Sequence, residues 1–246
     1  MKTTLAILIM VLLVGPASIA QEIVEHKKHR GGTHTHFDID LGLNNWLEDG
    51  NNPSGTNYEV KPWGSWYIAF KSINDTHVGG KFHLQWGPDV SFYSFKFQNE
   101  QTRVIKTDDE VLFLTEDLIS SRKSKLEVIY LGFSTVPMLQ FGERHGHGHW
   151  HHGDFAFGNN SGGFRIGIGA YGGYRLGSKT KYVTDENGGK DKEKDHDNFY
   201  LQNWRYGLRM QAGFRGVDFF FNYDLNEIFT DGRGPALNAI SFGVTL

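Results

Sequence analysis

The chain has 246 residues, of which 31 are Gly and none is Cys; its aromatic content is 14% and its formal net charge is −3. The absence of Cys excludes disulfides, thiolate metal sites and cysteine nucleophiles. Lysines and arginines are scattered among acidic residues, so the sequence has no basic footprint for nucleic acid. A Gly content above the usual ~7%, combined with many aromatics, favours crowded β-structure.

The first twenty residues predict a secretory signal peptide. Lys2 precedes an apolar run from Leu5 to Val14, and Ser18-Ile19-Ala20 suits cleavage after Ala20. This run is shorter than the ~20 apolar residues that a helix needs to cross a bilayer, although an N-terminal anchor is the alternative. We expect a signal peptide at 1–20, a flexible His- and Lys-rich segment at 21–32, and one folded domain at 33–246.

Alternating apolar and polar side chains predict β-strands along the rest of the chain. No later segment approaches ~18 consecutive apolar residues, so any membrane span would have to be β. Eight segments show the alternation, and it is most regular in the last third: Phe37 to Leu43, Trp66 to Lys71, Lys81 to Phe97, Leu126 to Phe141, Phe164 to Leu176, Trp204 to Arg215, Val217 to Asp224 and Ile240 to Leu246.

Within the third segment the apolar positions change phase. They run through Phe82, Leu84 and Trp86 and then through Tyr93, Phe95 and Phe97. An extra residue in a strand shifts its alternation by one position, so we expect a bulge or kink near Gly87-Pro88.

These segments predict an all-β fold, a single antiparallel transmembrane β-barrel of about eight strands. Val104 to Thr115 is either a hairpin within a loop or an additional pair, which makes ten strands the alternative. The chain ends in an alternating segment, which we expect to pair with the first strand and close the barrel. Strand direction then places Gln98 to Lys123, Ser178 to Asn198 and Asn226 to Ala236 at the outer end. The charge run Asp185 to Asp197 suits a mobile outer loop, and Gly142 to Gly163 is a long periplasmic connection.

Three strings resemble the porin-like, PorT-type outer-membrane β-barrel proteins of Bacteroidota. They are Tyr171-Gly-Gly-Tyr-Arg-Leu-Gly-Ser-Lys-Thr-Lys181, Trp204-Arg-Tyr-Gly-Leu-Arg209 and Gly234-Pro-Ala-Leu-Asn-Ala-Ile-Ser-Phe-Gly-Val-Thr-Leu246. The resemblance covers most of the mature chain and implies an outer-membrane location, with a link to protein secretion as one role. It carries over no catalytic motif. The chain departs from the family at Glu143 to Gly163, where the connection is longer.

The periplasmic connection contains five imidazoles within eight residues. Imidazole suits Zn, Cu and Ni, and intervening glycines let the rings converge, so a Zn or Ni site is one interpretation; a solvated tract without a specific metal is the other. Glu143 and Asp154 lie nearby, and His26, His29, His34 and His36 fall on the same side. The candidate ligands are His145, His147, His149, His151 and His152.

Two further side-chain sets follow from the alternation. Charged residues predicted to face inward should form a salt-bridge network, because an eight-stranded barrel is just wide enough to be filled by side chains; a narrow pore is the alternative. They are Asp38, Asp40, Lys71, Arg165, Arg175, Arg205, Arg209, Asp218 and Asp224. Aromatics predicted to lie at headgroup depth are Trp63, Trp66, Trp86, Trp204, Tyr206 and Tyr223.

The sequence thus favours a non-enzymatic barrel in the outer membrane with a side-chain-filled lumen. Its role would lie in envelope structure, recognition or secretion-linked assembly, its partners being outer-membrane lipid and other envelope or secretion proteins. No required cofactor is expected. The alternatives are a metal-binding barrel that uses residues 143–154 and a barrel enzyme that acts on envelope lipid, although no hydrolase motif is visible.

Overall fold

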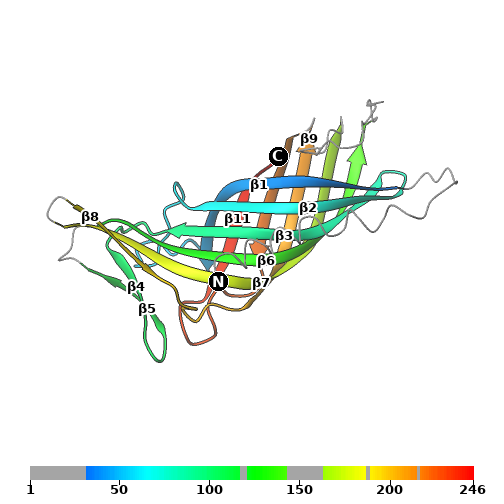
Figure 1. Ribbon diagram of the computed structural model, residues 1–246. Helices are drawn as coiled ribbons and strands as arrows, with labels where there is room; N and C mark the ends of the chain where they lie inside the picture. Colours follow the sequence, from blue (N-terminus) through cyan, green and yellow to red (C-terminus); the bar gives the residue numbers. More distant parts are fainter. Residues whose placement is uncertain (1–31, 117–120, 143–162, 187–188, 215–216) are drawn as a thin grey trace, which may run out of the picture.

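The computed structural model describes residues 32–116, 121–142, 163–186, 189–214 and 217–246, and within these ranges the regular structure is entirely β (Figure 1). None of these residues belongs to a helix long and apolar enough to cross a membrane. The strands are β1 (Thr33–Glu48), β2 (Trp66–Gly79), β3 (Phe82–Lys96), β4 (Thr102–Lys106), β5 (Val111–Thr115), β6 (Ser121–Phe141), β7 (Phe164–Glu186), β8 (Gly189–Asp195), β9 (Trp204–Phe214), β10 (Val217–Asp224) and β11 (Leu237–Thr245).

Eight of the strands form a closed antiparallel ring in the order β1, β2, β3, β6, β7, β9, β10, β11. The ring closes where β1 pairs with β11, from Asp40 opposite Thr245 to Glu48 opposite Leu237. The expected barrel of eight strands is therefore confirmed. Val104 to Thr115 belongs to a separate hairpin of β4 and β5 rather than to a ninth and tenth barrel strand.

The two ends of the ring differ in the length of their connections. At one end, which we call the loop end, lie the connections 49–65, 97–120, 187–203 and 225–236; the other, the turn end, has the short turn after β2. The three predicted outer loops all lie at the loop end, and 49–65 is a fourth that the sequence analysis did not include. The ends of the predicted periplasmic connection, Gly142 and Gly163, lie at the turn end as expected; residues 143–162 are outside the described residues.

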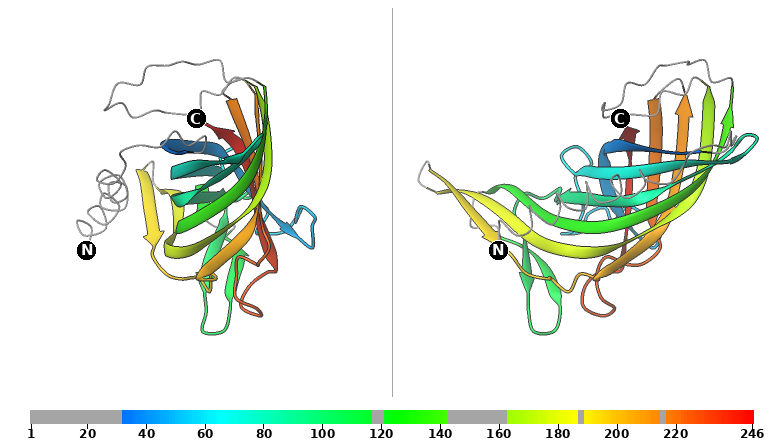
Figure 2. Two further views of the ribbon diagram at one scale, coloured as in Figure 1. Left: turned by 90° about the vertical axis from the view of Figure 1, so that its right-hand side faces the viewer. Right: turned by 45° about the vertical axis from the view of Figure 1, so that its right-hand side comes forward.

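The charge run from Asp185 to Asp197 is more ordered than the sequence predicted. Instead of an irregular loop, its residues Gly189 to Asp195 form β8, which pairs with the part of β7 that extends beyond the ring (Figure 2). The strict alternation of Lys with Asp or Glu gives this segment the period of a strand, and β7 supplies an open edge for it.

Alternation gives the ring an apolar exterior and a largely polar interior. Large apolar side chains on the outer face are exposed along every barrel strand, among them Leu41, Phe70, Trp86, Phe133, Ile166, Ile168, Leu208, Met210, Phe219, Phe221 and Phe242. Charged groups on the opposite face of the same strands are buried. This is the reverse of the arrangement in a water-soluble domain, where contiguous apolar surface of such extent is rare.

Of the bulge or kink expected near Gly87-Pro88, the bulge is wrong. The pairing of β3 with β2 keeps one register from Lys71 opposite Asp89 to Asn74 opposite Trp86, and the irregularity in this hairpin lies between His77 and Gly79. What changes along β3 is the lining of the lumen, between Ser91 and Tyr93. Towards the turn end the inward side chains of β3 are polar, such as His83, whereas Tyr93 and its successors on the same face are aromatic.

The hydrophobic core therefore lies inside the loop half of the barrel. Buried aromatic and aliphatic side chains from the ring meet others from the loop-end connections. Trp46 stacks on Phe95 with their ring centroids 4.5 Å apart, and its indole nitrogen donates to the Tyr58 carbonyl at 3.0 Å. The cluster includes Trp46, Val60, Tyr67, Phe95, Phe97, Phe113, Leu126, Val128, Phe199, Phe220, Phe229 and Leu237.

The closing seam provides a test of the ring. Gly42 faces Gly243 across it, and a Cβ on Gly243 would overlap the Leu41 carbonyl and the Gly42 backbone, whereas a Cβ on Gly177 would meet nothing. We predict that Gly243→Ala lowers the unfolding free energy by about 1–3 kcal/mol through overpacking, while Gly177→Ala does not. Urea titration of the refolded protein, followed by heat-modifiable gel mobility, measures both; equal midpoints for the two variants would contradict the seam.

Candidate functional site

The lumen is crossed by an ion pair near its middle. Arg209 of β9 donates from its two terminal nitrogens to the two carboxylate oxygens of Asp40 in β1, at 2.8 and 3.2 Å. Lys71 lies 3.6 Å from the same carboxylate, and the Thr245 hydroxyl donates to it at 2.6 Å. Asp40 is wholly buried, so its charge is compensated by two cations and a hydroxyl rather than by water.

A second arginine is enclosed by aromatic rings. The Arg205 guanidinium lies 4.4, 5.0 and 4.7 Å from the ring centroids of Tyr93, Tyr130 and Tyr171. It also donates to Asp224 at 2.8 Å, and the Tyr171 hydroxyl donates to the same carboxylate. Cation–π contact and a charge-assisted hydrogen bond together fix this side chain where the polar lumen meets the aromatic core.

Towards the turn end, Arg165 of β7 donates to Asp218 of β10 at 2.7 Å, and Gln211 donates to the same carboxylate at 3.2 Å. Of the nine charged residues expected to face inward, all except Arg175 are buried. It is half-buried near the loop end and donates to Asn203 and Ser178.

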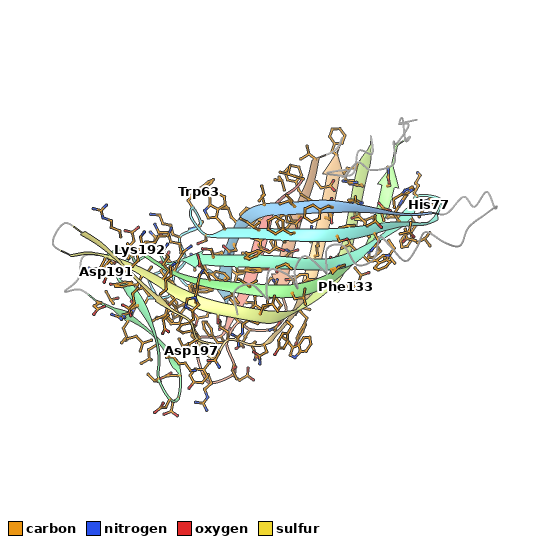
Figure 3. The ribbon with its side chains drawn as sticks, viewed as in Figure 1. Trp63, His77, Phe133, Asp191, Lys192 and Asp197 are labelled. Atoms are coloured by element: carbon orange, nitrogen blue, oxygen red, sulfur yellow. The ribbon has the colours of Figure 1, made fainter. Side chains whose placement is uncertain are left out.

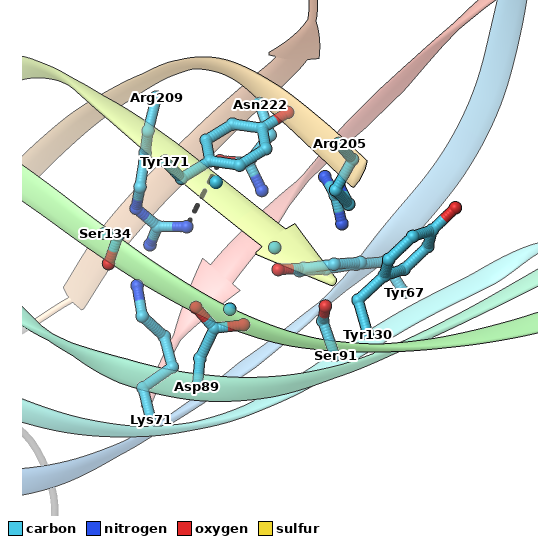
Figure 4. Close-up of a pocket in the computed structure, with 13 residues that line it drawn as sticks. Tyr67, Lys71, Asp89, Ser91, Tyr130, Ser134, Tyr171, Arg205, Arg209 and Asn222 are labelled. Carbon is cyan, nitrogen blue, oxygen red and sulfur yellow. Dashed lines mark hydrogen bonds between the residues drawn. The ribbon is translucent and has the colours of Figure 1, made fainter. Parts of the chain in front are cut away.

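The network occupies the middle of the lumen with paired side chains. Between the Arg205 and Arg209 layers remains a cavity of about 20 Å³, room for a single water molecule, lined by Lys71, Asp89, Tyr130 and Arg209 among others (Figure 4). An eight-stranded ring leaves no more space than its side chains take up.

The loop-end connections pack into one cap. In the β4–β5 hairpin, Val111 donates its backbone N–H to the Arg233 carbonyl at 2.8 Å, and Asn57 donates to the Phe113 carbonyl at 2.9 Å. The Tyr200 hydroxyl donates to the Thr107 carbonyl at 2.9 Å. Four connections far apart in the sequence are thus held together by backbone carbonyl acceptors, which favours a shaped surface over independent loops.

A cleft of about 420 Å³ opens between this cap and the extensions of β6, β7 and β8. That volume falls in the range of small-molecule sites. Its walls are charged: Arg103 pairs with Glu116 at 3.2 Å and with Glu193 at 2.7 Å. The Lys106 ammonium, 2.9 Å from Asp197, holds the pKa of that carboxyl below its usual value.

A row of polar side chains that the sequence analysis missed lies at the turn end. His83 of β3 contacts Asp75 at 2.8 Å through Nδ1 and His77 at 3.2 Å through Nε2. Figure 3 places His77 at this end, far from the charged extensions. The cross-strand position of His77 opposite His83 becomes visible only once the β2–β3 register is known.

The predicted metal ligands His145, His147, His149, His151 and His152 lie outside the described residues. Within the residues that are described, His, Asp and Glu side chains do not form a group of three or more suited to a metal ion. Of the predicted girdle aromatics, Trp63, Trp66, Trp86, Trp204 and Tyr206 are exposed, and Tyr223 is partly so.

No family model matches the chain, and no curated protein matches it. Among solved structures it is similar to Ail, the attachment invasion locus protein of Yersinia pestis, with a TM-score of 0.34 and 11% identity over 87% of this chain and 95% of that chain. Ail in complex with the heparin analogue sucrose octasulfate gives 0.31 and 10% over 86% and 94%. Because both TM-scores lie below 0.5, the closed ring is established by its strand pairings and not by this likeness.

The lumen network predicts that replacing two aspartates by Ala lowers the unfolding free energy by unequal amounts. Asp40→Ala leaves Arg209 and Lys71 charged and without their carboxylate in the lumen, so we expect a loss of about 3–5 kcal/mol in unfolding free energy. Asp109→Ala removes the fully exposed partner of Arg233, 3.7 Å away, and should cause no measurable loss. Denaturant titrations of both variants and the wild type check this. A stable Asp40→Ala protein would show that the buried pair is dispensable.

Proposed function

We propose that this chain is a non-enzymatic β-barrel protein of the bacterial outer membrane whose lumen is sealed and whose loop end carries recognition or assembly. The observation that carries the proposal is the inverted distribution of side chains, apolar outside and ion-paired inside, on a closed ring. Only helices and closed barrels satisfy every backbone hydrogen bond within lipid, and this chain builds the second.

Exposed aromatic side chains border the apolar exterior at both ends, as expected for membrane interfaces. Near the loop end Tyr174 packs against Trp204 with ring centroids 5.0 Å apart. Near the turn end Phe141 packs against Phe164 at 6.3 Å. Between these pairs the outward positions of β7 and β9 are apolar, among them Ile168 and Met210.

A sealed lumen favours a role at the surface over transport. The cap and its cleft of about 420 Å³ are the features with the shape and charge for binding a partner. An enzyme acting on envelope lipid would need a polar catalytic group at the lipid-facing rim. In contrast, the His83 contact with Asp75 and the His36 contact with Asp38, at 3.4 Å, both face the lumen.

Within this role, we propose that the chain is a PorT-type barrel of Bacteroidota with a part in secretion-linked assembly. The support is the sequence of the strings at 171–181, 204–209 and 234–246. Cross-linking in cells followed by identification of the captured envelope proteins tests the assembly role.

The membrane location is tested by fractionation. We expect the mature chain, beginning near Gln21, to remain in the membrane pellet after alkaline carbonate extraction and to run faster on gels before heating than after. A soluble chain without heat-modifiable mobility would contradict the proposal and favour an exported soluble β-fold.

A metal-binding role is the second candidate. The two strand ends that the imidazole-bearing connection joins, Phe141 of β6 and Phe164 of β7, lie at the turn end, as do His77 and His83. We propose that the tract binds Zn or Ni as a property that folding does not require.

Calorimetry tests the metal proposal. The wild type should bind Zn or Ni at neutral pH and release it as the pH falls through ~6.5, because only neutral imidazole donates a lone pair to metal. A variant with His145, His147, His149, His151 and His152 changed to Ala should lose this uptake and keep its gel mobility. Equal uptake by the two proteins would reject the tract as the site.

A further inference from the structure

The outward face of β3, β6 and β7 changes character towards the loop end. On β6 the outward side chains run from Phe133 through Leu131 and Ile129 and then become Glu127, Lys125 and Lys123. Neighbouring strands change at the same border. On β3 the apolar run ends at Phe92 and Lys96 follows; on β7 it ends at Leu176, and Lys179 and Lys181 follow.

Beyond this border four lysines lie side by side on adjacent strands. Lys96 of β3 is paired in register with Lys125 of β6, which is paired with Lys181 of β7, which is paired with Lys194 of β8. Side chains opposite each other in antiparallel strands have Cβ atoms about 4.5–5.5 Å apart, and like charges there destabilise the sheet. A continuous row of four lysines therefore destabilises the sheet unless anions neutralise their charge.

A second row lies next to the first. Val183 is paired with Lys123 on one side and with Lys192 on the other, and it is buried beneath them. β8 separates its charges by face: Lys192 and Lys194 share the outward face, whereas Glu193, on the opposite face, bonds Arg103 of the cap. Figure 3 shows Lys192 and Asp191 at the far end of these extensions.

The carboxylates on this face are fewer than the lysines. Glu100 lies 2.8 Å from Lys96, and Glu127 contacts Lys125 and lies 2.9 Å from Lys179. Lys123, Lys181, Lys192 and Lys194 form no ion pair with any described residue. Excess positive charge therefore remains on a surface that continues directly from the apolar exterior of the ring.

We propose that this lysine face, formed by Lys96, Lys123, Lys125, Lys179, Lys181, Lys192 and Lys194, binds the phosphate groups of lipids in the leaflet around the loop end. The inference rests on the proposed membrane location. It goes beyond it in assigning a lateral lipid site, which shares Lys181 with the lining of the cleft, and in naming the phosphate-bearing headgroup as the occupant.

Depth supports the lipid as the occupant. Lys125 lies four residues beyond Ile129, which is about 13 Å along a strand and about 9 Å in depth at a tilt of about 45°. Headgroups occupy the several ångströms beyond the hydrocarbon layer, and lysine side chains reach back towards it. Basic residues near a membrane surface attract anionic headgroups, and each one raises the binding constant about fivefold, which corresponds to ~1 kcal/mol.

The test uses the full mature protein in nanodiscs of phosphatidylcholine with phosphatidic acid as the minor lipid. Native mass spectrometry measures the ratio of the two lipids that stay bound. We expect enrichment of phosphatidic acid by the wild type and a loss of about fivefold for each lysine removed in Lys125→Gln/Lys181→Gln/Lys194→Gln. Replacing the same three lysines by Arg should retain the enrichment, and Lys61→Gln/Lys81→Gln, outside the face, should not change it.

Equal enrichment by the triple Gln variant and the wild type overturns the proposal. So does binding of soluble pyrophosphate in detergent without enrichment of phosphatidic acid, because the face would then serve a soluble anion. Insertion into pure phosphatidylcholine, measured by heat-modifiable gel mobility, distinguishes a failure of the membrane location from a failure of the lysine face. A protein that does not insert contradicts the membrane location itself, whereas one that inserts without preferring phosphatidic acid contradicts only the lysine face.

Discussion

The structure depends on the narrowness of an eight-stranded ring. Inward side chains have little room for bulk water, so inward charges need protein partners, and the arginines of the lumen find theirs on other strands. Arg209 of β9 reaches Asp40 of β1, and Arg165 of β7 reaches Asp218 of β10. The same pairs that make the interior tolerable also hold distant strands at fixed separations and close the lumen. Sealing is a consequence of the diameter rather than an added device.

The closed ring has two distinct outer surfaces. Its apolar exterior suits only an apolar solvent. The cap, where Phe113 packs on Phe97 and Phe229, presents a shaped and charged surface at the loop end. The extensions of β6 and β7 with β8 lie between these two regions. In the proposed function, lipid contact and stability use opposite faces of the same strands, because alternation lets one strand serve two environments, and recognition uses the cap.

Period-two alternation was enough to predict the ring, its strand count and its inward charges, since each depends on which face a residue takes. The phase change at Gly87 was misread because the sequence shows where apolar residues lie but not which face encloses them: Tyr93 is apolar and inside, Phe92 is apolar and outside. Contacts that need register could not be predicted. The lysine row across β3, β6, β7 and β8 and the pairing of His77 with His83 are of this kind.

The central claim, that paired side chains seal the lumen, is tested most directly by single-channel recording of the refolded protein in planar bilayers. The account predicts insertion, confirmed by gel mobility of the same sample, without steady conductance. Stable steps of the size that open porins give would contradict it, because ions would have to pass the paired side chains of the Arg205 and Arg209 layers, which leave a cavity of about 20 Å³ between them.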